Sequence, residues 1–499
     1  MRLFVIHSDI QMTGKPFLKL TSKMLFFLVA TIVLCRVTSN YALIPILGVG
    51  VFFALSNQRG KALVFYLLLP FLTIINPLIL PKVGLFSAFA RGGTLVMSGA
   101  LLVAAVRSPG KQTLPFGVMY LYLVVAFVSS LQGYFPLISL LKVVNFLVFL
   151  LGIHIGTRNL HHRPEDILLL RATLFAFAIL IVLGSLLTLP FPGVAYYISL
   201  KRAISEIGLQ SAGDMVYTRE KFSLFSGITN HSQFLAPMLA CLAGWLACDM
   251  LLIEKRITRI HAILLALIPV LLFMTRSRAG FFAFLAMGIM VYFYCLPKIA
   301  LPAKVKGRLS GIMVSFLVIL TLVGVIYEAK DSLISRWLRK SDDLAEDTRT
   351  LNEAVTGSRQ GLIEQSLNDY RRARLLGSGF QVQENHRALY DAGIINLFSA
   401  SIEKGLLPLM VLGETGILGA ITFSLFLWSF WIGCAQKRYI ATFTLFVVFL
   451  STNIAEATFF SPGGGGGILW MVCVVGGFLI DMTVYIERNG TQPQLMRRT

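Results

Sequence analysis

The chain has 499 residues, of which 56% are hydrophobic and 14% are charged, and its formal net charge is +20 at pH 7. Soluble domains contain roughly 25% charged residues, so this composition excludes an ordinary soluble protein and favours an integral membrane protein. The six cysteines fall in or beside apolar segments and the histidines show no metal-ligand spacing, so neither a disulfide framework nor a metal site is predicted.

Apolar runs long enough to cross a bilayer recur along the chain. Lipid offers no partner to open backbone groups, and the alternating pattern of a β-barrel is absent. We therefore expect an all-α polytopic membrane bundle of about 14 transmembrane helices, forming a single domain over 1–499. The predicted helices are 24–36, 41–56, 62–80, 84–106, 114–132, 135–156, 167–190, 230–253, 260–275, 279–297, 309–327, 406–432, 439–455 and 467–486.

Two long segments, 191–229 and 328–405, interrupt this pattern, and the second is strongly charged. Half of the 44 basic residues lie in the two tails and in alternate connectors. The short connectors of the other side contain Arg36, Lys82, Arg276 and Arg278. This bias follows the positive-inside rule, which predicts that both termini are cytoplasmic and both long segments external. The positive charge is then explained by topology, and a nucleic-acid partner is not expected.

Six ionisable residues lie inside or near the ends of the predicted helices, where each is costly. Arg171, Asp249 and Asp481 are near the cytoplasmic ends, where snorkelling explains them. Arg91, Lys142 and Glu414 lie in the outer half of the membrane. Glu414 could pair with Arg91 or Lys142 as a structural ion pair, or the cations could face an anion in a cavity that opens outward.

The external turn Thr275–Arg278 contains two arginines at the start of a helix, against the positive-inside bias. Arginine binds phosphate oxygens in bidentate fashion, and the free N–H groups of a helix N-terminus add to the attraction. Arg276 and Arg278, together with Arg91 and Lys142, therefore suit a lipid-linked diphosphate. Lipid headgroups holding interfacial arginines are the alternative.

Within the charged segment, 358–376 is predicted to form an amphipathic helix that begins with Ser358 as its N-cap. This helix would lie on the membrane or cover a cavity. Further along the chain, the glycine run 463–467 would either let a substrate approach the backbone or form a flexible turn.

Three patches of the chain resemble the O-antigen ligase and Wzy-type polysaccharide polymerase superfamily. Gly227–Ala236 (GITNHSQFLA) is similar to its glycine and His-Pro-Asn-like segment, and Leu272–Gly280 (LFMTRSRAG) to its Thr-x-Ser-Arg-Gly/Ala-Gly turn. The third patch is similar to its Ser-Gly-Arg, Gly-x-Gly and Glu-x-Gly series around a long periplasmic loop. It consists of Gly357-Ser358-Arg359, Leu376–Phe380 (LGSGF) and Leu412–Gly419 (LGETGILG).

The resemblance implies an inverting, metal-independent glycosyltransferase of the GT-C type that needs no cofactor. It would act in the bacterial inner membrane on oligosaccharides carried by undecaprenyl diphosphate, at the periplasmic side. Arg278 and Arg359 match the arginines that hold the donor's diphosphate, and His231 lies in the His-Pro-Asn-like segment as a substrate-binding residue. Membrane lipid and the machinery for polysaccharide export and chain length are the partners that it implies.

The chain departs from the ligases of this family, which have His-Asn about nine residues before the Glu-x-Gly motif. Glu403 and Lys404 stand beside that place. A carboxylate can accept the proton of an acceptor hydroxyl, and Lys404 would keep it ionised. We therefore predict a repeat-unit polymerase with Glu403 as the base and Glu414 as its rival. A ligase and a transporter or flippase of lipid-linked sugars are the alternatives; a transporter should show an internal repeat, which is not seen.

Overall fold

The computed structural model describes residues 14–81, 86–106, 114–158, 160, 163–196, 224–298, 351–382, 406–454 and 458–490. Its α-helices are α1 (Lys15–Val37), α2 (Leu43–Leu55), α3 (Arg59–Ile74), α4 (Phe86–Val106), α5 (Gly117–Gln132), α6 (Pro136–Gly156), α7 (Pro164–Leu187), α8 (Pro192–Ala195), α10 (Ser232–Asp249), α11 (Arg259–Thr275), α12 (Arg278–Met290), α15 (Leu351–Arg372), α17 (Leu407–Lys437), α18 (Ile440–Thr452), α19 (Gly465–Leu469) and α20 (Gly476–Gly490). π-Helical turns extend α10 to Glu254 and α12 to Cys295, and another, Trp470–Val475, joins α19 to α20.

The described part of the chain is helical, with one isolated antiparallel bridge between Ile75 and Thr229, so the all-α prediction is confirmed there. Seven of its helices are long and apolar enough to cross a membrane. They are Lys15–Val37, Pro136–Gly156, Pro164–Leu187, Ser232–Glu254, Arg278–Cys295, Leu407–Lys437 and Gly465–Arg488. Five shorter apolar helices accompany them, at Leu43–Leu55, Ala90–Ala104, Gly117–Gln132, Arg259–Thr275 and Ile440–Thr452. The helix predicted at 309–327 lies outside the described residues.

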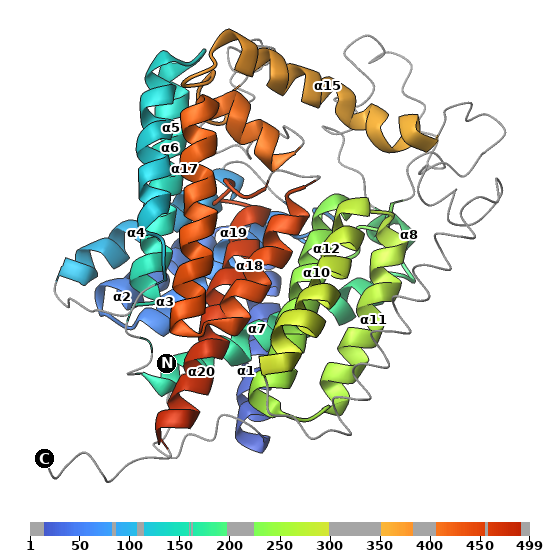
Figure 1. Cartoon of the computed structure of the whole chain (residues 1–499). Coiled ribbons are helices and arrows are strands. Elements are labelled where there is room, and N and C mark those ends of the chain that lie inside the picture. The colour runs from blue at the N-terminus through green and yellow to red at the C-terminus, as the bar shows by residue number, and fades with distance from the viewer. Residues whose placement is uncertain are drawn as a thin grey trace, which may run out of the picture.

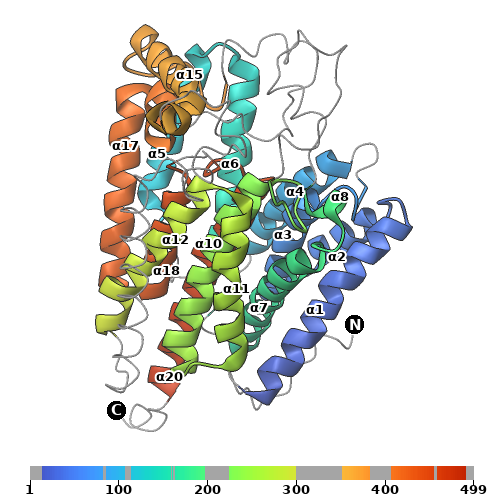
Figure 2. The same cartoon turned by 90° about the vertical axis from the view of Figure 1, so that its right-hand side faces the viewer.

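The helices form an upright bundle with one helix lying across its end. Helices α5, α6 and α17 stand on one side and α10, α11 and α12 on the other, while α15 runs across the upper end (Figures 1 and 2). Helix α10 and the α19–α20 unit are buried almost throughout, whereas α1 and α17 are exposed along one side. The core therefore lies between α7, α10 and α20, and the helices around it have a face available for lipid.

The basic connectors of the described chain gather at the lower end of this bundle. The guanidinium of Arg59 donates to the carbonyl of Arg158 at 2.9 Å, and Lys255 forms an ion pair with Glu487 at 3.1 Å. The first contact joins the start of α3 to the residues after α6. The second joins the residue after the π-helical end of α10 to the last part of α20. We call this the basic end, and the opposite one the α15 end. The described basic connectors are therefore together at one end, as the predicted topology requires of them.

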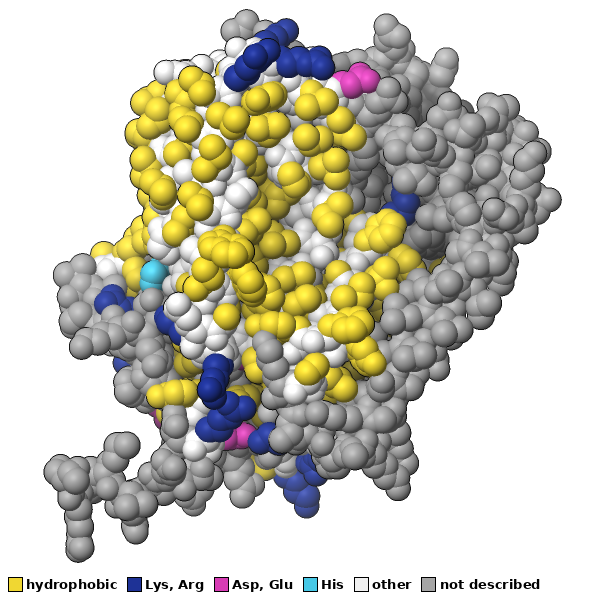
Figure 3. Space-filling model, viewed as in Figure 1, with side chains coloured by type: hydrophobic (Ala, Val, Ile, Leu, Met, Phe, Trp, Pro, Cys, Tyr) yellow, Lys and Arg dark blue, Asp and Glu magenta, His cyan; other side chains and the backbone are white. Residues whose placement is uncertain are grey.

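The outer surface of the bundle has the character of a membrane protein. On the face seen in Figure 3, hydrophobic side chains cover the middle, and Lys and Arg side chains lie above and below them. Exposed residues such as Trp428, Ile421 and Leu425 of α17 contribute to this apolar surface. Because a bilayer favours apolar side chains at its centre and basic ones at its edges, the surface matches a membrane-spanning bundle.

The snorkelling prediction for Arg171 and Asp249 is wrong, because the two side chains bind each other inside the bundle. The Nε and Nη2 atoms of Arg171 donate to the two carboxylate oxygens of Asp249 at 2.6 and 2.9 Å. Arg171 also binds Glu254 at 2.8 Å, and His261 contacts Asp249 at 3.1 Å. Arg171 and Asp249 are 1% and 0% exposed, so they are stabilised by mutual pairing rather than by the membrane interface.

Asp481 is likewise buried rather than snorkelling. Its carboxylate accepts hydrogen bonds from the backbone N–H groups of Ala441 and Thr442 at 3.0 and 2.9 Å and from the Thr442 hydroxyl at 2.7 Å. These N–H groups belong to the first turn of α18, where no helical carbonyl can accept them. Asp481 of α20 therefore caps α18 from a neighbouring helix.

Candidate functional site

A break in α17 opens the helix to a second segment of the chain. At Gly416 the backbone has φ 63° and ψ −163°, which interrupts the helical hydrogen bonds. The carbonyls of Gly413 and Glu414, freed by the break, accept hydrogen bonds from the N–H groups of Ser378 and Gly379 at 2.9 and 3.0 Å. The chain that follows α15 therefore binds the break through backbone hydrogen bonds, and we call residues 374–382 the docked segment.

The pairing continues on the other side of the break and leaves no room for side chains. The N–H of Ile417 donates to the carbonyl of Arg374 at 2.9 Å. A β-carbon at Gly377 would lie 2.3 Å from the carbonyl carbon of Glu414, and one at Gly416 would lie 2.4 Å from that of Leu375. Two of the resemblance segments, LGSGF and LGETGILG, thus meet through their glycines.

Helix α6 and the segment before α19 hold the same stretch of chain from its other side. The hydroxyl of Ser139 donates to the carbonyl of Phe380 at 3.0 Å, and the ammonium of Lys142 donates to that of Gln381 at 3.0 Å. The side-chain amide of Gln381 in turn donates to the carbonyl of Phe460. Lys142 is 3% exposed, so the structure places it against the docked segment inside the bundle.

Glu414 lies at the break and is 1% exposed. Besides binding Gly379, its backbone carbonyl accepts a hydrogen bond from the Ser129 hydroxyl of α5 at 2.6 Å. Both of these bonds go to the main chain of Glu414. Its backbone position is fixed from two sides, which is the kind of rigidity that a working side chain needs.

A second part of the candidate site lies where α10 and α12 begin side by side. His231 caps α10, since its Nδ1 accepts the N–H of Gln233 at 3.0 Å, and Ser277 caps α12 by accepting the N–H of Gly280 at 3.4 Å. A β-carbon at Gly280 would lie 2.4 Å from the Cβ of Ala236. This close approach brings the two helix N-termini together at the α15 end.

The two arginines of the Thr275–Arg278 turn lie at this pair of helix N-termini. Arg276 ends α11 in the left-handed conformation, with φ 50°, and Arg278 is the first residue of α12. Both are partly exposed. Helix N-termini carry about half a positive charge each, so the cap residues and the arginines add to one positive potential.

The glycine run 463–467 packs against both α4 and α10. A β-carbon at Gly463 would lie 2.9 Å from Cβ and Cγ of Arg91 in α4, and one at Gly465 would lie 1.7 Å from the ring of Phe234. Phe234 is one helical turn beyond His231. These glycines are therefore tightly packed, in contrast to the flexible turn that was one of the two alternatives. Arg91 lies beside Gly463, on the side of the run that faces α4.

Three of the predicted site residues have no described side chain. Arg359 lies in α15, but its side chain is outside the described part of the structure, and Glu403 and Lys404 lie outside the described residues altogether. The predicted helix itself exists, yet it begins at Leu351, so the prediction that Ser358 is its N-cap is wrong.

Sequence reasoning missed two residues that build the site, Ser139 and Gln381. Both are uncharged and bind backbone carbonyls, so nothing in hydropathy or charge distinguishes them. A weak signal existed for each, since Gln381 directly follows LGSGF and Ser139 lies one helical turn before Lys142.

No protein-family model matches the chain, and no curated protein matches it either. The described site residues, Arg91, Lys142, His231, Arg276, Arg278 and Glu414, therefore stand on their own geometry. Among these six described residues, four are Lys or Arg and one is a carboxylate.

Proposed function

We propose that the protein is a glycosyltransferase that polymerises oligosaccharide units carried on undecaprenyl diphosphate, outside the cytoplasmic membrane. The observation that carries the proposal is the pairing of LGSGF with the broken helix of LGETGILG. Segments 35 residues apart, singled out only by their resemblance to the polymerase and ligase superfamily, hydrogen-bond to each other through Ser378 and Gly413. Such pairing suits a shared site better than chance similarity. About 14 membrane crossings and cytoplasmic termini belong to the same proposal.

In this proposal the donor's diphosphate lies at the α10–α12 N-termini. Arg278 and Arg276 would bind its oxygens, and the helix N-termini would add to the attraction. Arg359 would bind the diphosphate as well, as the resemblance to the family implies. Arg91 belongs to the same positive region. Lys142 has a second role, because it also holds the docked segment through Gln381.

The reaction is a single displacement. A hydroxyl oxygen of the acceptor sugar attacks the anomeric carbon of the donor, and the bond from that carbon to the diphosphate oxygen breaks. The configuration inverts because attack and departure occur on opposite faces. Glu403 accepts the hydroxyl proton, and the arginines neutralise the departing lipid diphosphate, so that positioning and electrostatics supply most of the acceleration.

Burial weakens the case for Glu414 as the base. A general base must come within about 2.6–3.2 Å of the group that it deprotonates. The Glu414 side chain is 1% exposed and sits at the fastened break of α17, so an acceptor sugar reaches it only if the docked segment moves. Glu414 fits a positioning role at the break, and Glu403 is the preferred base.

The function is tested in proteoliposomes that contain the purified chain, a lipid-diphosphate oligosaccharide and no nucleotide. A ladder of longer lipid-linked glycans is expected. Transfer to an acceptor that is not the carrier lipid would instead identify a ligase. Movement of the substrate across the bilayer without new glycosidic bonds would contradict both enzymes and favour the transporter.

The residue assignments are tested in the same assay. Arg278→Ala and Glu403→Gln are each expected to abolish the ladder while the protein still elutes as a folded species. Arg256→Ala at the basic end and Glu364→Gln on the exposed side of α15 are the matched controls and should remain active. An active Glu403→Gln variant would remove the assignment of the base.

A further inference from the structure

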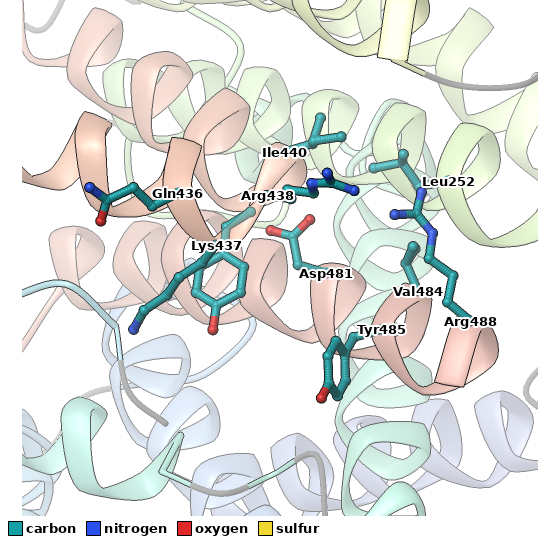
Figure 4. A pocket seen from close by; sticks show the side chains of 10 residues that line it. Leu252, Gln436, Lys437, Arg438, Ile440, Asp481, Val484, Tyr485 and Arg488 are labelled. Carbon is teal, nitrogen blue, oxygen red and sulfur yellow. The ribbon is translucent and has the colours of Figure 1, made fainter. Parts of the chain in front are cut away.

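A second site lies at the basic end of the bundle, far from the residues used above. A pocket of about 300 Å³ opens between the turn that joins α17 to α18 and the last part of α20. Its volume is at the lower end of the range of small-molecule pockets, roughly 300–1,000 Å³. Lys437, Arg438 and Arg488 line it together with Asp481 (Figure 4).

The described lining of this pocket is positive overall, because Lys437, Arg438 and Arg488 stand against the single carboxylate of Asp481. Asp481 is buried and caps α18 through the N–H groups of Ala441 and Thr442. Lys437, Arg438 and Arg488 are exposed. Figure 4 shows the guanidinium groups of Arg438 and Arg488 pointing toward one another from the α17–α18 turn and from α20. Two convergent guanidinium groups present a fork of donors that matches phosphate oxygens.

The backbone at Arg438 fixes where its side chain leaves the turn between α17 and α18. Arg438 follows the last residue of α17 with φ 58°, a left-handed conformation that costs an L-residue roughly 1 kcal/mol or more. Glycine is the usual residue at such a helix end. Lys255 and Arg276 follow other helices in the same conformation, so for Arg438 the turn sets the position of the side chain beside the pocket and not its ligand.

The position of the pocket identifies the source of the phosphate. It opens at the edge of the apolar surface of the bundle, and Tyr439 and Tyr485 line it. Tyr485 is 44% exposed, as expected of a tyrosine at a membrane–water interface. Basic pockets between membrane helices at this level bind the headgroups of anionic lipids. We propose that this pocket binds the phosphate of an anionic phospholipid.

Lipid binding to the purified full-length chain tests this proposal. Native mass spectrometry in detergent would compare phosphatidylglycerol with zwitterionic phosphatidylethanolamine. The wild type is expected to retain phosphatidylglycerol preferentially, and the Arg438→Gln/Arg488→Gln variant to bind it roughly 10- to 30-fold more weakly, because each cation near a membrane surface contributes a factor of about five.

The matched control removes two charges from the same end of the bundle but outside the pocket. Arg256→Gln/Arg259→Gln changes two exposed arginines, one just before α11 and one at its first position, and should leave lipid binding as in the wild type. An equal loss in this control would show attraction to general surface charge and overturn the site. Inorganic phosphate at constant ionic strength is the third arm. If phosphate alone stabilises the wild type and phosphatidylglycerol does not, the lipid assignment fails.

Discussion

Gly416 and Gly377 decide whether the chain after α15 can enter the break in α17. Each has a positive φ, and each would carry a β-carbon within 2.4 Å of the backbone of the other segment. Neither a rotamer change nor a small shift of one side chain relieves such a clash, because the atoms concerned belong to the main chain. The docked segment therefore requires glycine, which has no β-carbon, at both Gly377 and Gly416.

We expect Gly416→Ala to lower the melting temperature of the purified protein. The left-handed backbone alone costs roughly 1–2 kcal/mol, and the contact with Leu375 adds to it. Thermal unfolding in detergent measures the effect. Gly361→Ala is the control, because a β-carbon there meets nothing within 4 Å and alanine favours the helix α15. An equal loss in both variants, or none at Gly416, would contradict the docking described here.

At the scale of elements, α6 and the docked segment form one unit through Lys142. The ammonium is buried and donates to the carbonyl of Gln381, which leaves that carbonyl dependent on a single side chain of α6. Removing the ammonium would leave the buried Gln381 carbonyl without this donor. The cost of a buried carbonyl that has lost its donor exceeds the net stabilisation that an ordinary hydrogen bond provides.

We expect Lys142→Met to destabilise the protein by about 1–3 kcal/mol, because the Gln381 carbonyl loses its donor. The distinguishing measurement is hydrogen exchange of the amides of 377–382, which should become faster. Lys142→Arg retains a donor and should restore much of the protection. Lys61→Met, at the basic end, is the matched control and should leave these amides unchanged. Unchanged exchange in Lys142→Met would assign Lys142 to substrate binding alone.

The elements themselves are readable from the sequence, because the membrane imposes length and hydropathy on each helix. The prediction of 135–156 differs from α6 by one residue, and 260–275 differs from α11 by one. The contacts between elements are not readable in this way. The pairing of Arg171 with Asp249 joins residues 78 positions apart. The hydropathy of the two helices is the same whether these charged side chains pair with each other or snorkel to the interface.

The candidate site is predictable in the same partial sense. The motifs pointed to His231, Arg278 and Glu414, which the fold gathers at one end of the bundle. The break at Gly416 was not foreseen, because glycine inside an apolar run has no distinctive signal until a second backbone approaches it. The uncharged residues Ser139 and Gln381 were missed for a related reason, since their partners are backbone carbonyls.

At the scale of the whole molecule, the two ends of the bundle differ in charge. The connectors at the basic end hold Arg59, Arg158, Lys255 and Arg438, while the α15 end contains the glycine-rich break. Both sites described above depend on this polarity, because the proposed glycan substrate and the proposed phospholipid lie on opposite faces. The orientation of the bundle therefore fixes which compartment each site serves.

We expect the α15 end to face the outside of the cell, because positive connectors remain in the cytoplasm. The six native cysteines are buried and can be replaced by alanine, and single cysteines then report sidedness. In intact cells, a membrane-impermeant maleimide should label Arg371→Cys on α15 and should label Arg256→Cys only after permeabilisation. Leu72→Cys, which is 0% exposed in the wild type, controls for nonspecific labelling. The reverse pattern would place the α15 end in the cytoplasm, where the proposed polymerisation of externally displayed glycan units does not occur.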